Sequence, residues 1–214
     1  DGRETAVILH ANSERGRRQR AQFEQAFEAR GGRIVSAIGY SPNGADTPID
    51  ELLNISRSEA RHRRLEANLG RNIEFEPRRR ADIDMIFLQA DPGNGPAQAR
   101  LLIPLLSNSG ASPDDIPTYA TSDVYDPTRT GSDRDLDGLM FADVPLLIEP
   151  GGAGATAAGR LGEFATSSAR QRPRLFAFGF DAYRLIDALY VRGEARWPVA
   201  GATGELFLGD NGRI

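Results

Sequence analysis

Polar side chains follow three predicted strands at the point where each strand ends. The strands are the apolar runs 5–9, 85–88 and 116–120. Open α/β sheets bind ligands beyond the carboxyl ends of their strands, where amide, hydroxyl and carboxylate groups can contact a small molecule. The predicted ligand contacts are Asn12, Ser13, Asp91, Ser122 and Asp123.

Carboxylates at strand ends could also act as an acid/base pair. Asp91, Asp123, Asp143 and Asp181 are the candidates, and the sequence does not set the distance between any two of them. An Asp at a strand end more commonly caps the next helix or accepts hydrogen bonds from a loop. The structural role is therefore favoured over catalysis for all four.

The sequence contains no nucleophile with a matching base. It has no Cys, and no Ser lies in a Gly-x-Ser-x-Gly elbow. His10 ends a predicted strand, and His62 is expected to be exposed on a helix. A hydrolase or transferase is therefore the weakest of the functional alternatives.

Two Gly-containing motifs partly match known metal or phosphate sites. Residues 133–138 match the first half of a calcium loop, but its twelfth position is Val144 instead of a bidentate carboxylate. Residues 93–95 resemble a phosphate-binding turn but lack the full dinucleotide and P-loop patterns. We therefore expect polar turns at both places, with no metal and no cofactor.

An Arg-rich segment covers residues 54–80. Leu65 and Leu69 predict a thin apolar stripe on a helix that ends at Gly70. The segment could be a solvated helix with ion pairs along it, or a surface that binds an acidic partner. Arg57, Arg61 and Arg64 share one helical face and are the predicted partner contacts.

The composition is that of an ordinary globular protein. Of the 214 residues, 40% are hydrophobic and 26% are charged. The net charge of −4 argues against a general nucleic-acid binder, which needs a basic surface. No apolar run is long enough to span a bilayer, and the chain begins just before a strand, as a piece of a longer protein would.

Strands and helices alternate along most of the sequence, which predicts a parallel sheet with helices on both faces. The predicted strands are 5–9, 33–38, 85–88, 116–120, 139–145, 175–178 and 205–208. The predicted helices are 14–30, 47–53, 54–70, 97–106 and 181–190.

The Gly- and Ala-rich residues 151–159 predict a linker or a loosely formed helix start. We place a domain boundary there, between residues 1–149 and residues 150–214. The first domain holds five of the predicted strands complete, together with the predicted ligand contacts. The Asp210-Asn211-Gly212 turn is expected to close the last strand.

Several stretches resemble the C-terminal domain of the LppC/LpoA family, outer-membrane lipoproteins that activate penicillin-binding proteins. The most specific feature is PRRR-x-D-x-D before an apolar strand, at residues 77–88. The stretches that carry the resemblance are residues 31–42, 60–92, 115–125, 134–145, 175–185 and 201–214.

The resemblance implies a type I periplasmic-binding-protein fold, in which two Rossmann-like lobes flank a cleft. Residues 1–149 would form one intact α/β lobe, the second lobe of that fold. Residues 150–214 would form the crossover and part of the other lobe. The resemblance also implies a periplasmic protein held at the outer membrane by a lipid anchor that lies outside this sequence.

The leading hypothesis is a non-enzymatic regulator that binds a class A penicillin-binding protein and promotes peptidoglycan synthesis. Peptidoglycan or a small cleft ligand is a further possible partner, and no nucleic acid is expected. The alternative is a solute-binding receptor for a small amino-acid-like ligand, held by the strand-end residues.

Overall fold

The computed structural model describes most of the chain. The described residues are 2–41, 43–44, 46–127, 134–149, 151–152, 154–164, 171–186, 189 and 197–209. They divide into two compact units, residues 1–142 and residues 143–214. Each unit is described by itself.

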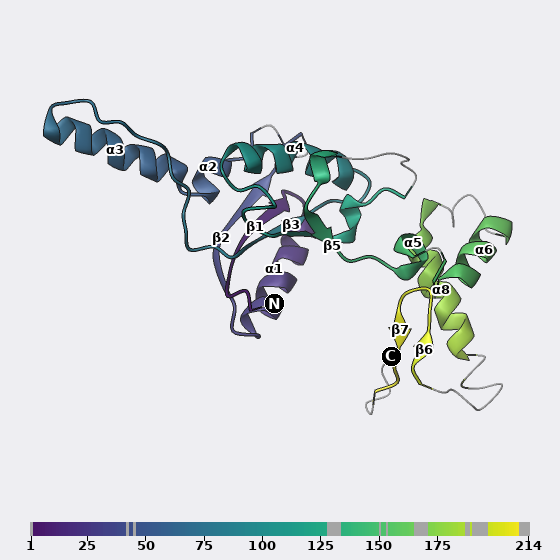
Figure 1. The fold of residues 1–214 in the computed structure, drawn as a ribbon. Coiled ribbons are helices and arrows are strands. Elements are labelled where there is room, and N and C mark those ends of the chain that lie inside the picture. The colour runs from purple at the N-terminus through teal and green to yellow at the C-terminus, as the bar shows by residue number, and fades with distance from the viewer. Residues whose placement is uncertain are drawn as a thin grey trace. The chain divides into compact units, whose positions relative to one another are not determined.

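Unit 1 contains a five-stranded parallel sheet in the order β2-β1-β3-β4-β5 (Figure 1). The strands are β1 (Thr5–Ala11), β2 (Arg33–Tyr40), β3 (Met85–Gln89), β4 (Thr118–Ala120) and β5 (Leu139–Phe141). The chain moves outward from β1 to β2 and then returns to the other side of β1 at β3. The strand order therefore reverses between β1 and β3, which is the usual place for a ligand site.

Two predicted strands of unit 1 are shorter in the structure. The strand predicted for residues 116–120 begins at Thr118, because Pro117 has no N–H to donate to the ladder. The strand predicted for residues 139–145 ends at Phe141, and Pro145 begins the short helix α5 (Pro145–Ile148) instead. Pro at the first turn of a helix is well tolerated.

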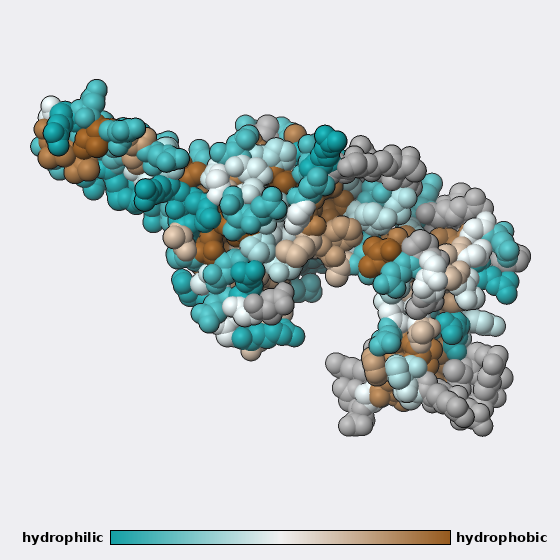
Figure 2. All heavy atoms as spheres, viewed as in Figure 1, coloured by the Kyte–Doolittle hydropathy of each residue, from teal (hydrophilic) through white to brown (hydrophobic). Residues whose placement is uncertain are grey.

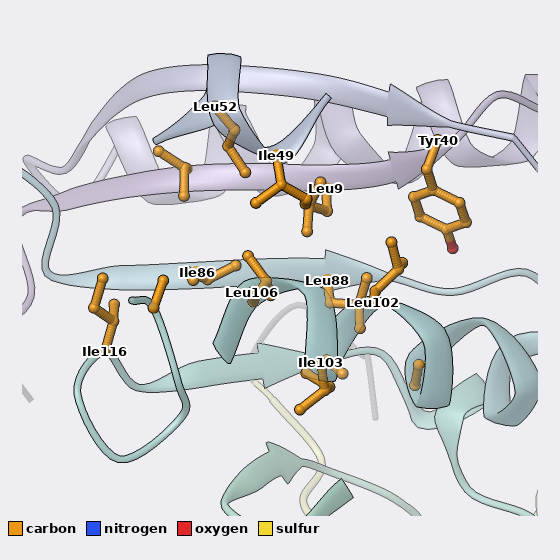
Figure 3. Packing of buried hydrophobic residues seen from close by; sticks show 14 of the residues in the cluster. Leu9, Tyr40, Ile49, Leu52, Ile86, Leu88, Leu102, Ile103, Leu106 and Ile116 are labelled. Carbon is orange, nitrogen blue, oxygen red and sulfur yellow. The ribbon is translucent and has the colours of Figure 1, made fainter. Parts of the chain in front are cut away.

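One face of the sheet packs on helices α2 (Ile49–Leu52) and α4 (Gly95–Asn108). Figure 3 shows the apolar side chains of this core lying between the strands and these two helices. Its fully buried large side chains from the strands include Leu9, Ile86 and Leu88. Strands β1 and β3 are almost entirely buried, as expected for the centre of a parallel sheet.

The opposite face is covered by α1 (Glu14–Glu28). Phe23 of α1 stacks on Phe87 of β3, with ring centroids 3.9 Å apart and the planes nearly parallel. Phe27 continues this stack along the helix. The side of α1 that carries Phe23 and Phe27 is therefore the one that packs on the sheet.

Helix α3 (Ile55–Leu69) extends away from the sheet, and residues 71–80 return alongside it (Figure 1). We call α3 and residues 71–80 together the arm. Asn54, just before the helix, has a left-handed backbone conformation with φ of 59°. Asn tolerates this conformation better than most residues, and it redirects the chain between α2 and α3.

Unit 2 is built mainly from helices. It contains α5, α6 (Ala155–Phe164), α8 (Pro173–Ile186) and the short antiparallel pair β6 (Val199–Ala200) and β7 (Glu205–Leu206). Among its described residues, a small cluster of buried apolar side chains comes from α5, α6, α8 and the loop after β6. They are Leu146, Ala157, Ala177 and Ala202.

The strand predicted for residues 175–178 was wrong, because these residues lie in α8. Ala177, Asp181 and Leu185 are buried at helical spacing, and Phe176 and Phe180 stack one turn apart. A short apolar run fits a strand or a buried helix equally well, and here helix packing decided. Residues 151–159, predicted as a linker or a loosely formed helix start, lead into α6, which begins at Ala155. The predicted turn at residues 210–212 lies outside the described residues.

Candidate functional site

Ser13 and Asp91 meet at the point where the strand order reverses. Ser13 is the N-cap of α1, and its Oγ accepts a hydrogen bond from the Gly16 N–H at 2.9 Å. The same hydroxyl donates to Asp91 Oδ1 at 3.0 Å. The loops after β1 and β3, which are far apart in the sequence, are thus joined through one hydroxyl.

A buried glutamine forms hydrogen bonds with the backbone at the start of both loops. Gln89, at the end of β3, is fully buried, and its Oε1 accepts from the Ala11 N–H at 2.9 Å. Its Nε2 donates to Gln19 Oε1 at 2.9 Å and to the Ala90 carbonyl at 2.6 Å. A Cβ on Gly16 would come within 2.2 Å of the Ala11 carbonyl oxygen, so only Gly lets α1 begin this close to β1.

Tyr40 extends the same network from the end of β2. Its buried hydroxyl lies 2.7 Å from the Gln89 carbonyl and 3.0 Å from Gln98 Oε1. Gln98 Oε1 also accepts from the Asp91 N–H at 3.2 Å. Burial, and secondly the negative charge of Asp91, raise the pKa of the Tyr40 phenol, so the hydroxyl stays a neutral donor.

Asp123 lies on the loop after β4, in the short 3-10 helix Ser122–Val124. Its carboxylate is 3.5 Å from Arg15 Nη2 of α1, and its side chain is only 15% exposed. A Cβ on Gly95 would lie 2.2 Å from the Asp123 carbonyl oxygen, so the start of α4 fits closely against this loop. The β4 loop therefore contacts the beginnings of both α1 and α4.

The structure brings together some of the predicted ligand contacts and separates others. Ser13 and Asp91 are hydrogen-bonded, and Asp123 reaches α1 through Arg15. Asn12 points toward β2, because a Cβ on Gly39 would lie 1.9 Å from Asn12 Oδ1. Ser122 begins the 3-10 helix.

Sequence reasoning missed four residues of this edge. Arg15, Tyr40, Gln89 and Gln98 were not among the candidates, although all four contact a predicted site residue or its loop. The available signal was Gln89, a polar residue at the end of an otherwise apolar strand. Such a residue is buried only when its amide is hydrogen-bonded.

The chemistry available at this edge is hydrogen bonding and charge. Its hydroxyl, carboxylate and guanidinium groups could hold a small polar molecule, but each already has a partner within the protein. His10 is buried, with Nδ1 3.0 Å from the Ala11 carbonyl oxygen. Within the described ranges, no three His, Asp or Glu side chains gather as metal ligands would.

Asp143 and Asp181 have structural contacts in unit 2. The Asp143 carboxylate is almost fully buried and forms a two-point ion pair with Arg174. Asp181 is also buried and accepts hydrogen bonds from the Ala202 and Thr203 N–H groups and from the Thr203 hydroxyl. The predicted loop 133–138 is described only from Arg134 onward, because Asp133 lies outside the described residues.

The predicted partner contacts Arg57, Arg61 and Arg64 are exposed on one side of α3. We call these three residues the Arg face. None of them forms an ion pair with a described residue. The opposite side of α3 faces residues 71–80 and holds Ser58, His62 and Glu66.

His62 is less exposed than predicted. Its side chain is 16% exposed and stacks on Phe75, with ring centroids 4.1 Å apart. Its Nε2 lies 3.2 Å from Glu66 Oε1, which also accepts from the Ile73 N–H at 3.0 Å. The chain returning along α3 covers this ring, and helical periodicity alone cannot predict that.

Cavities lie at the base of the arm. One of about 420 Å³ is lined in part by Asn54, Arg57 and Arg80, and also by Asp50 and Glu51. Another of about 710 Å³ is lined mainly by residues 76–81 and 108–110. None of the five predicted ligand contacts lines either of these two cavities.

Among the described helices, none is both long and apolar enough to cross a membrane.

A family model described as "LppC putative lipoprotein" matches residues 1–214. A penicillin-binding protein activator LpoA from Photobacterium profundum is 25% identical over 212 residues, covering 97% of this chain and 33% of the relative. The Vibrio cholerae protein of the same name is 28% identical over 161 residues, covering 75% of this chain and 25% of the relative. The chain thus spans about a third of the length of these relatives, or less.

Solved structures match over the whole chain. Full-length LpoA from Haemophilus influenzae has a TM-score of 0.56 at 18% identity, covering 100% of this chain and 33% of that one. A "putative branched-chain amino acid ABC transporter" from Rhodospirillum rubrum has a TM-score of 0.53 at 20% identity, covering 100% of this chain and 56% of that one. The predicted α/β fold of the periplasmic-binding-protein type is confirmed.

Proposed function

Because the chain belongs to the LppC/LpoA family, we propose that it is part of a penicillin-binding protein activator. The observation that carries this proposal is the match of the whole chain to relatives that bear that name. The polypeptide that contains this chain binds a class A penicillin-binding protein in the periplasm and increases its peptidoglycan cross-linking. A lipid anchor elsewhere in the polypeptide holds it at the outer membrane.

The proposed role is regulation without catalysis. It is supported by the strand-end residues of unit 1, whose polar groups brace the loops against one another. An activator of this kind works by binding the active conformation of the synthase more tightly than the inactive one. Its effect is therefore limited by that difference in affinity.

The test is a cross-linking assay with the full mature polypeptide, a purified class A penicillin-binding protein and a lipid-linked peptidoglycan precursor. We expect a severalfold rise in cross-linked muropeptides at saturating activator. An unchanged product profile would contradict the proposal. Equal activation of a monofunctional class B transpeptidase would keep the activator role but remove its class A specificity.

A second candidate function is the binding of a small amino-acid-like ligand at the carboxyl edge of the sheet. The observation that favours it is the meeting of Ser13 and Asp91 at the reversal of strand order. Asn12, Ser122 and Asp123 lie on the neighbouring loops and complete the proposed contacts. Calorimetry of the full polypeptide with amino acids and peptidoglycan fragments tests it, and saturable heat that is lost in Asp91→Ala would support it.

A further inference from the structure

We propose that the Arg face of α3 is a docking surface for an acidic segment of the partner protein. The proposal rests on the activator function proposed above and assigns that function a contact surface. Its starting point is the uneven charge of the chain. Residues 54–80 carry eight Arg and four Glu, a net charge of +4, in a chain whose net charge is −4.

The three cations of the Arg face lie apart from the two carboxylates of α3. Glu66 lies on the side that packs against the return segment, where it faces His62 and the Ile73 N–H. Glu59 lies within 4.0 Å of Arg63, at the flank of the helix. The Arg face is left with three exposed cations and no internal carboxylate, because spacings of four and three residues put Arg57, Arg61 and Arg64 together.

The arm is held in shape by its own contacts. The His62–Phe75 stack and the Glu66 contacts join α3 to residues 71–80 along the middle of the helix. Nearer the base, the Leu53 carbonyl accepts from the Arg80 N–H at 2.8 Å. A surface that is already ordered loses less conformational entropy on binding, so its contacts contribute more to affinity.

The Arg face continues into the cavity at the base of the arm. Arg57 belongs to both, and Arg80 lines the same cavity from the return segment. Arg80 is held by Asp82 through two hydrogen bonds of 2.7 and 2.8 Å, so its position is defined. The cavity of about 420 Å³ is also lined by Asp50 and Glu51, so we place the acidic segment on the Arg face and not inside the cavity.

The geometry favours a protein over a membrane as the occupant. A helix that lies in a bilayer surface needs an uncovered apolar side opposite its cations. In α3 that side is covered by residues 71–80 and carries Glu66 and His62. Leu65 and Leu69 are about half exposed and can add apolar contact to a protein interface. Figure 2 shows hydrophobic residues interrupting the hydrophilic surface of the arm.

The test measures the dissociation constant between the full mature polypeptide and a purified class A penicillin-binding protein. The variant is the triple substitution Arg57→Gln, Arg61→Gln, Arg64→Gln, since Gln keeps helix propensity and removes the charge. We expect a rise in Kd of about tenfold at low salt, mainly through slower association. The difference in Kd between the variant and the parent should shrink at high ionic strength, where exposed charges are screened.

Two matched triple variants separate charge from other effects. Arg57→Lys, Arg61→Lys, Arg64→Lys keeps the charge and should retain most of the affinity. Arg17→Gln, Arg18→Gln, Arg30→Gln removes three exposed cations from or beside α1 and should leave Kd nearly unchanged. Circular dichroism and thermal unfolding of each variant verify that the fold is kept.

Four outcomes would overturn the docking surface. If the parent activates the synthase and the α3 Gln variant binds as tightly as the parent, the surface lies elsewhere although the activator function stands. If the α3 and α1 Gln variants lose affinity equally, net charge and not the Arg face is responsible. If the α3 Gln variant binds the synthase as the parent does but no longer binds phosphatidylglycerol vesicles, the Arg face binds a membrane. A parent that neither binds nor activates the synthase overturns both proposals.

Discussion

Ser13 joins two loops that are 78 residues apart in the chain. One hydroxyl accepts from the Gly16 N–H and donates to Asp91, so it caps α1 and ties the β1 loop to the β3 loop. The prediction of Ser13 as a ligand contact remains untested. Its structural role can be measured independently of any ligand.

Ser13→Ala should lower the free energy of unfolding by about 1 kcal/mol, because the helix cap is lost. Ser13→Asp should also destabilise, although Asp is normally as good a cap as Ser, because its carboxylate would face Asp91 at contact distance. Ser13→Thr serves as the control that keeps the hydroxyl. Urea unfolding at neutral pH checks all three variants. An Asp variant as stable as the Thr variant would show that the Asp91 carboxylate does not repel a negative charge at position 13.

Asp84 fastens the start of β1 to the start of β3. Its Oδ2 accepts from the Glu4 N–H, the Thr5 N–H and the Thr5 hydroxyl at 2.9 to 3.1 Å. The hydrogen bond from the Glu4 N–H, followed by those from Thr5, lowers the pKa of this carboxyl. A group with a lowered pKa stabilises the fold above its unfolded pKa of about 4 and loses this effect as the pH falls through its folded pKa.

Asp84→Asn should therefore be less stable than the parent at pH 7. The difference should fade as the pH drops below about 4, where the parent carboxyl also becomes neutral. Urea midpoints of both proteins across this pH range are the measurement. Asp114→Asn, at an exposed turn, is the control. If the stability difference between Asp84→Asn and the parent does not change with pH, the charge of the Asp84 carboxylate is not its cause.

At the scale of elements, the arm differs from the helices that cover the sheet. Helices α1, α2 and α4 bury side chains against strands, whereas α3 packs on its own return segment and on α2. Its stability should therefore be separable from that of the sheet. Local opening of such an element costs less free energy than global unfolding.

Phe75→Ala should raise hydrogen exchange in α3 about tenfold while leaving the β1 and β3 amides unchanged, because the lost ring stacks on His62 of the arm. Hydrogen–deuterium exchange with residue-level resolution is the measurement. Leu65→Ala, on the exposed flank of the same helix, is the control for lost bulk. Faster exchange in β1 as well would mean that the arm and sheet unfold together.

At the scale of the whole molecule, the two units differ in how much core they contain. Unit 1 has a contiguous core between a five-stranded sheet and its helices. Among the described residues of unit 2, the buried core cluster holds Leu146 and three Ala side chains, while Leu175, Phe178, Ile186 and Phe207 are more than half exposed. Small cores leave little net stability after the entropy cost of folding.

Residues 1–142 expressed alone should therefore unfold in one cooperative transition, because their core does not depend on unit 2. Residues 143–214 alone should show no sharp transition and should bind a hydrophobic dye such as ANS. Urea titrations followed by circular dichroism and dye fluorescence test both statements. Cooperative unfolding of the second piece would show that its small core suffices.

The predicted assignment of residues 1–149 and 150–214 to the two lobes of a binding-protein fold stays a prediction. The structure divides the chain at Asp143, close to where the sequence changes from alternating strands and helices to a Gly- and Ala-rich stretch. The fold class itself is confirmed by solved structures that match the whole chain.

The sequence by itself determined the parallel strands of unit 1, the turns after them and the shared helical face of Arg57, Arg61 and Arg64. These features depend on residues close together in the chain, whose periodicity and caps can be read directly. Tertiary structure alone decided the strand order, and with it the contacts of Tyr40 with Gln98 and of Ser13 with Asp91. It also decided that residues 175–178 form a helix, because a short apolar run takes the conformation in which its neighbours can bury it.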